Sequence, residues 1–159
     1  MRTNYQTTSI PIVCPALADA VHLGLIENEA RPGRNVTGIE PYIAGLPAKQ
    51  IELARELVPH ASKVGLLTND ADPKGLPQTR ELTSVLVEMR LDAVSANADQ
   101  FSEIGAAIER LAAERVDVVV VMQTNLMIVR RFMIAEAALA NRLPTVYGCY
   151  ERCGDTGCL

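Results

Sequence analysis

The sequence has no tryptophan and only two phenylalanines among its 159 residues, although 48% of them are hydrophobic. Its core must therefore be built from aliphatic side chains and methionine. No apolar run approaches the roughly 18–20 residues that are needed to span a bilayer. The longest run, Val116–Met122, is interrupted by Asp117 and is typical of a buried strand.

Clusters of basic charge are also lacking. The 15 Lys and Arg residues are outnumbered by 19 Asp and Glu residues, and both kinds are scattered along the chain. This pattern argues against nucleic acid or an anionic membrane as a partner. The glycine-rich nucleotide loops, the GxSxG elbow and the HExxH zinc motif are absent as well. We therefore predict no catalytic residue and no cofactor.

Four cysteines are present, and three of them fall in the last eleven residues: Cys149, Cys153 and Cys158. Their spacing lacks the paired Cys-x2-Cys of zinc sites and a fourth local ligand. We predict no metal site and interpret residues 149–159 as an irregular tail. The N-terminus has no apolar stretch followed by a cleavage site, so the chain as written is expected to remain cytoplasmic.

Helix and strand patterns alternate from residue 46 onward. The expected strands are apolar without alternation, which is typical of strands buried on both faces of a parallel sheet. Right-handed crossovers then give a doubly wound, parallel three-layer α/β sandwich. We expect strands at 64–67, 93–96, 118–122 and 145–147, and helices at 46–58, 82–89, 101–111 (capped by Asp99) and 125–141 (capped by Asn125).

The first 43 residues do not continue this pattern. They predict a strand over Ile10–Cys14, a helix over about residues 20–30 that is capped by Asp19, and an extended piece over Asn35–Ile39. These elements have no sheet of their own within the repeating βα units. We therefore expect them to pack somewhere else.

Polar residues follow the carboxyl ends of the predicted strands, where ligands bind in open parallel α/β sheets. Hydrogen-bonding groups of this kind orient a small polar or zwitterionic molecule. A helix cap or a loop hydrogen bond is the alternative role for each of them. The candidate ligand-binding residues are Asp19, Asn69, Asp70, Gln123, Thr124, Asn125 and Tyr147.

Several short motifs occur in a fixed order. Residues 9–38 read SIPIVCPALADAVHLGLIENEARPGRNVTG, Ala48-Lys49 and Glu56–Pro59 follow, and residues 143–148 read LPTVYG. Over about residues 8–148 this order resembles the ABC-transporter substrate-binding proteins of the periplasmic type I class, in the tryptophan-binding-like branch. The resemblance implies that one lobe of a type I binding protein is present, together with a remnant of the other.

The resemblance divides the chain into a lobe-one remnant with a crossover (1–43), lobe two (44–148) and the tail. Because family members are about twice as long, the chain is expected to be truncated. The resemblance implies an amino-acid-like ligand held between two lobes, an ABC permease as partner, and a periplasmic or lipid-anchored location. It places Asn69 in a conserved-type turn, and Thr124 where many members carry an acid that could hold the ligand ammonium.

Two other functions remain open. The apolar segment 9–43 favours burial by association, which predicts a homodimer and permits an α/β interaction domain without ligand function. Asp70 and Asp72 beyond a strand end suggest a flavodoxin-like enzyme or phosphoacceptor domain. However, none of Lys49, Lys63 and Lys74 lies at a later strand end, where such a site needs one.

Overall fold

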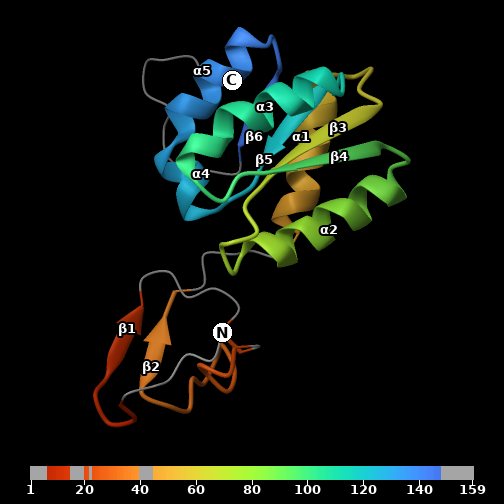
Figure 1. The fold of residues 1–159 in the computed structure, drawn as a ribbon. Coiled ribbons are helices and arrows are strands. Elements are labelled where there is room, and N and C mark those ends of the chain that lie inside the picture. The colour runs from red at the N-terminus through yellow and green to blue at the C-terminus, as the bar shows by residue number, and fades with distance from the viewer. Residues whose placement is uncertain (1–6, 15–19, 22, 40–44, 148–159) are drawn as a thin grey trace. The chain divides into compact units, whose positions relative to one another are not determined.

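The computed structural model describes residues 7–14, 20–21, 23–39 and 45–147. The chain divides into two compact units, Met1–Ile43 (unit 1) and Ala44–Leu159 (unit 2) (Figure 1). None of the helices in the described residues is both long enough and apolar enough to cross a membrane.

Unit 2 contains a four-stranded sheet in the order β4-β3-β5-β6, and all of its neighbouring strands are parallel. The strands are β3 (Lys63–Thr68), β4 (Asp92–Asn97), β5 (Val118–Val121) and β6 (Thr145–Tyr147). The central strands β3 and β5 are buried almost throughout, whereas most residues of β4 at the sheet edge are exposed. The predicted parallel α/β sandwich is confirmed.

Helices cover both faces of this sheet (Figure 1). One face carries α1 (Leu46–Leu57) and α2 (Gly75–Glu88). The other face carries α3 (Ile104–Ala113), which follows the short 3-10 helix η1 (Phe101–Glu103), and α5 (Arg131–Ala140). The five-residue helix α4 (Asn125–Val129) directly precedes α5.

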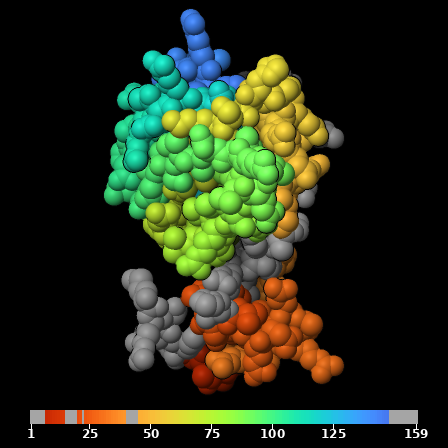
Figure 2. All heavy atoms as spheres, turned by 90° about the vertical axis from the view of Figure 1, so that its right-hand side faces the viewer, coloured from red at the N-terminus to blue at the C-terminus, as the bar shows by residue number. Residues whose placement is uncertain are grey.

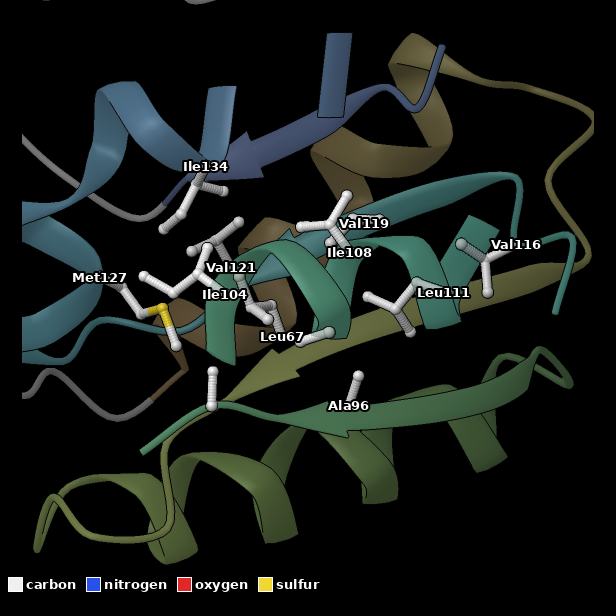
Figure 3. Close-up of a cluster of buried hydrophobic side chains, with 12 residues drawn as sticks. Leu67, Ala96, Ile104, Ile108, Leu111, Val116, Val119, Val121, Met127 and Ile134 are labelled. Carbon is white, nitrogen blue, oxygen red and sulfur yellow. The ribbon is translucent and has the colours of Figure 1, made fainter. Parts of the chain in front are cut away.

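Successive strand residues enter opposite cores, as the two-residue period of a strand requires. Val119 and Val121 pack with Ile108 and Ile134 on the α3/α5 face (Figure 3). Val118 and Val120 pack with residues of α1 and α2. Both faces must therefore be apolar, which explains why β5 is an uninterrupted run of valines.

Three helices of unit 2 end in the same way. Arg90, Arg115 and Arg142 have φ values of 56°, 56° and 55°, in the left-handed region that favours glycine. At the end of α3, the Arg115 N–H donates to Ala112 O (2.9 Å) and the Val116 N–H donates to Leu111 O (3.4 Å). This is the Schellman pattern with an arginine in the glycine position.

Asp117 joins the segments that enter β3 and β5. Its Oδ2 accepts hydrogen bonds from the Ser62 N–H (2.8 Å) and the Lys63 N–H (2.9 Å). These two backbone donors stabilise the carboxylate and lower the pKa of Asp117 below its usual value. Figure 2 views this amino edge of the sheet, where the segments before β3 (yellow) and β5 (teal) lie side by side.

The predicted single helix over 125–141 is wrong, because Arg130 has φ −101° and ψ 17° and separates α4 from α5. The expected caps also differ. Thr124 is the N-cap residue of α4, so Asn125 is already helical. Before α3, Gln100 and Glu103 form a capping box, while the Asp99 carboxylate accepts the Ala71 N–H instead (3.0 Å).

Unit 1 has two short parallel strands, β1 (Ile12–Cys14) and β2 (Val36–Gly38). The predicted helix over 20–30 is wrong, because the described part of that segment consists of turns and bends. Gly24 has φ 68°, and the Leu25 N–H donates to Ala20 O at 2.8 Å. A left-handed glycine with this six-to-one hydrogen bond ends a helical turn.

Candidate functional site

The carboxyl ends of the four parallel strands lie at one edge of the sheet, which we call the carboxyl edge. From β3 the chain continues through α2 to β4, and from β5 it continues through α4 and α5 to β6 on the other side. The strand order therefore reverses between β3 and β5, and the helices α2 and α5 cover opposite faces of the sheet. Ligands of open α/β sheets bind at such a switch point.

The segments after β3 and β5 are joined by Gln78, a residue of α2. Its Nε2 donates to Gln123 O (3.1 Å), and its Oε1 accepts the Gln123 N–H (2.9 Å). Gln78 is only 2% exposed. Sequence reasoning missed this residue, although it lies one turn before Leu82 and two turns before Leu86 on the buried stripe of α2. A polar residue on an apolar stripe was the available signal.

Asp72 makes a second bridge between the same two segments. Its Oδ2 accepts the Asn125 N–H (3.2 Å), and its Oδ1 accepts the Lys74 N–H (2.9 Å). The buried Asn69 supports this turn, because its Oδ1 accepts the Asp72 N–H (3.0 Å). A Cβ on Gly75 would collide with Asn69 O, so the tight return into α2 depends on glycine.

The end of β4 is tied to the end of β3. Asn97 Oδ1 accepts the Asp70 N–H (3.0 Å) and the Thr68 hydroxyl (3.3 Å). The side chain of Asp70 is exposed, and its carboxylate makes no hydrogen bond or ion pair with another described residue. Asp70 therefore presents a charge at the carboxyl edge that the described residues leave unneutralised.

Thr124 follows β5 and is fully buried. Its Oγ1 has no hydrogen-bond partner among the described residues, although buried hydroxyls are normally paired. Its neighbours Gln123 and Asn125 are half-buried and exposed, respectively. The segment after β5 thus offers two accessible amide side chains and one buried hydroxyl.

The structure brings together, around the switch point, the candidates that follow β3 and β5: Asn69, Asp70, Gln123, Thr124 and Asn125. Tyr147 ends β6, on the far side of β5, and its hydroxyl donates to Arg131 O (3.3 Å). Asp19 lies outside the described residues.

The described groups at this edge suit binding of a polar molecule. The edge offers a carboxylate and amides that can donate or accept hydrogen bonds. His60 lies between α1 and β3, at the opposite edge of the sheet. Across the described ranges, no group of three or more His, Cys, Asp or Glu residues is arranged to hold a metal ion.

Comparison with known protein families agrees with this architecture. The family model described as "ABC transporter substrate binding protein" matches residues 2–159. The chain belongs to this family. The predicted resemblance to ABC-transporter substrate-binding proteins is therefore confirmed.

Three similar proteins are informative. A "Tyrosine-binding protein" of Clostridioides difficile (strain R20291) is 29% identical over 140 residues, which are 88% of this chain and 40% of that protein. The solved structure of a conserved domain protein from Vibrio cholerae has a TM-score of 0.81 at 24% identity, covering 91% of this chain and 48% of its own. An ABC domain from Streptococcus pneumonia, solved in complex with L-Trp, has a TM-score of 0.77 at 20% identity, covering 89% and 47%.

The chain thus spans about half the length of the proteins that it matches, or less. At these identities, the two solved structures establish the fold. The curated relative is named for tyrosine binding, and the ABC domain was solved in complex with L-Trp.

Proposed function

We propose that unit 2 binds an aromatic amino acid at its carboxyl edge, as the substrate-binding part of an ABC importer. The observation that carries the proposal is the convergence at the switch point of the unneutralised Asp70 carboxylate with the amides of Gln123 and Asn125. A relative named for tyrosine and a fold neighbour solved with L-Trp support the aromatic class.

In this proposal Asp70 holds the ligand ammonium, because a carboxylate is the strongest acceptor for that cation. Gln123 and Asn125 bind polar groups of the ligand. Asn69 and Thr124 shape the site, since both are buried. Asp19 and Tyr147 are also proposed as ligand contacts.

The role of Asp70 is testable in the 159-residue chain by titrating L-tryptophan and following backbone amide signals by NMR. Asp70→Asn removes the charge and is expected to weaken binding about tenfold, because a hydrogen bond to a charged group contributes roughly 1.5–3 kcal/mol. Asp92→Asn is the matched control, since Asp92 is an exposed carboxylate at the start of β4. Equal affinities for both variants would contradict the proposed role of Asp70.

The importer role rests on the family as a whole. In two-lobed binding proteins a ligand shifts the equilibrium between open and closed forms, and the permease distinguishes the closed form. We propose this mechanism, an ABC permease as partner, and a location outside the cytoplasmic membrane for the full binding unit. Because unit 2 supplies one side of such a site, we expect the 159-residue chain to bind tryptophan only with millimolar affinity. Sub-micromolar binding would contradict the one-sided site.

We also propose that the chain forms a homodimer through unit 1. Unit 1 leaves apolar side chains exposed, among them Val13 of β1 and Ile39 directly after β2 (75% and 68%). A two-stranded sheet is marginal by itself and gains stability when its apolar surface is buried. Light scattering should give twice the chain mass, and Val13→Asp should lower it toward one chain. A single-chain mass at high protein concentration would contradict the dimer.

Binding rather than catalysis is the activity that we propose. In the described residues of the carboxyl edge no histidine lies beside a hydroxyl or thiol, so the edge presents no nucleophile–base pair. A relative named for tyrosine binding and a fold neighbour solved with L-Trp support this proposal. A turnover of any amino acid by the purified chain would contradict this part of the proposal.

A further inference from the structure

An arginine and a phenylalanine stack at the carboxyl edge, outside the group of residues considered so far. The Arg130 guanidinium carbon lies 5.3 Å from the centre of the Phe101 ring. Phe101 opens η1, four residues after the end of β4, and Arg130 follows α4, the helix after β5. In Figure 1 the start of α3 and the helix α4 lie together at the left, where the strands end.

Contacts already described connect this stack to the switch point. On one side, the Asp99 carboxylate accepts the Ala71 N–H. On the other, Asp72 accepts the N–H of Asn125, the first residue of α4. The Phe101–Arg130 stack adds a direct contact between the segment after β4 and the end of α4 at the carboxyl edge.

The core holds these elements in place. Met127 of α4 and Ile104 of α3 are fully buried members of the same apolar cluster (Figure 3). The Glu103 carboxylate accepts the Asp99 N–H (2.8 Å) and the Gln100 N–H (3.2 Å), which fixes the turn before Phe101. The stack is therefore carried by segments that are anchored in the core, although Phe101 itself is 56% exposed.

The Arg130 guanidinium has unused binding capacity. It is exposed, and apart from the Phe101 ring its side chain contacts no hydrogen-bond or ion-pair partner among the described residues. The acids nearest in sequence to Phe101, Asp99 and Glu103, are engaged by backbone N–H groups. A guanidinium that stacks through one face keeps its N–H edge for bidentate binding of a carboxylate.

We propose that Arg130 binds the carboxylate of the amino-acid ligand, and that Phe101 is a positioning residue that orients its guanidinium. This inference rests on the proposed function. It assigns a partner to the ligand carboxylate, whereas Asp70 binds only the ligand ammonium. With Asp70 alone, the site would accept any primary amine. The Arg130 side chain therefore makes the site select amino acids over amines.

The test compares L-tryptophan, tryptamine and indole-3-propanoate, which carry both charged groups, only the ammonium, and only the carboxylate. Binding to the full 159-residue chain is followed by amide shifts of residues 69–72 and 123–125. The wild type should prefer tryptophan over tryptamine by about tenfold, the effect of one charge-assisted pair. Arg130→Gln should abolish this preference while tryptamine affinity stays unchanged.

Three further variants separate positioning from folding. Arg130→Lys should keep part of the preference, because an ammonium attracts a carboxylate but cannot bind it in a bidentate manner. Phe101→Leu should reduce the preference about threefold through lost orientation. Arg110→Gln, an exposed arginine in the last turn of α3, is the matched control and should behave like the wild type.

The outcomes distinguish the two proposals. Tryptophan binding at residues 69–72 and 123–125 that keeps its preference in Arg130→Gln would overturn the role of Arg130 and leave the site intact. Equal loss of tryptophan and tryptamine affinity in Arg130→Gln would also overturn it, since that pattern reports a structural role. If none of the three compounds shifts an amide at the carboxyl edge, the proposed function fails together with this inference.

Discussion

The side-chain amide of Gln78 exchanges two hydrogen bonds with the backbone of Gln123, at 3.1 and 2.9 Å. The two residues are 45 positions apart, and they belong to segments on either side of the point where the strand order reverses. The neutral side-chain amide supplies both a donor and an acceptor in one planar group. The shape of the candidate site is therefore fixed by the same contact that joins α2 to the segment after β5.

Gln78→Leu should lower the free energy of unfolding by roughly 2–3 kcal/mol, because the N–H and C=O of Gln123 lose their partners in a buried setting. Denaturant unfolding measures the change. Gln123→Ala is the matched control: it keeps the backbone groups that bind Gln78, so it should change stability by less than about 0.5 kcal/mol. Equal losses for both variants would contradict the bridge.

Gly75→Ala should destabilise unit 2 by about 1–3 kcal/mol, since the new Cβ would collide with Asn69 O and force the loop to move. Gly105 in α3 has open space at the corresponding position. Gly105→Ala should instead stabilise the chain by about 0.5–1 kcal/mol through helix propensity. Thermal unfolding of both variants measures these opposite changes in stability. If Gly75→Ala left stability unchanged, the close approach of residue 75 to Asn69 O would be disproved.

Asp117 should make stability depend on pH in the acid range. Its pKa is lowered in the folded state by the Ser62 and Lys63 N–H groups, whereas the unfolded chain has the ordinary value of about 3.9. A lowered folded pKa contributes stability that is present in full above the unfolded value and is lost as pH falls through the folded value. Asp117→Asn should therefore be less stable than the wild type at neutral pH, by only about 0.5–1 kcal/mol because solvent screens a carboxylate that is only partly buried.

The same difference should shrink as the pH falls below about 4, because the wild-type carboxyl then becomes neutral as well. Urea unfolding of both proteins between pH 7 and pH 2.5 measures this convergence. A constant difference over the whole range would show that the charge of Asp117 contributes nothing.

Arg115→Gly should stabilise unit 2 by about 0.5–1 kcal/mol, because glycine adopts the left-handed conformation after α3 without steric cost. Arg110→Gly, within the last turn of the same helix, should destabilise by about 1 kcal/mol. Chemical denaturation of both variants therefore tests whether the same change to glycine raises the free energy of unfolding at one position and lowers it at the other. Destabilisation by Arg115→Gly would contradict the Schellman ending.

The parallel sheet was predictable because its strands carry the signal in consecutive residues. Val118–Val121 and Val64–Leu67 have no polar residue at odd or even positions. This pattern is typical of a strand that is covered on both faces. The same order of elements then places Asn69 and Gln123 at one edge without any knowledge of side chains. Fold and location of the site thus follow from pattern and topology.

The features that the sequence did not predict depend on tertiary contacts. The sequence predicts Asp99 as an ordinary helix cap, but its carboxylate accepts the N–H of Ala71, 28 positions away. Gln78 is polar in a helix, and its burial follows from its partner Gln123 in the segment after β5. The break at Arg130 and the turn at Gly24 depend on single backbone conformations, which periodicity does not encode.

The central claim is that the carboxyl edge of unit 2 holds an aromatic amino acid at the switch point. An amide-resolved NMR titration of the 159-residue chain with L-tryptophan tests it most directly. We predict saturable shifts at residues 69–72 and 123–125, and none at residues 60–63 and 113–117 of the opposite edge. Shifts confined to the opposite edge, or no saturable shift up to the solubility of tryptophan, would contradict the account.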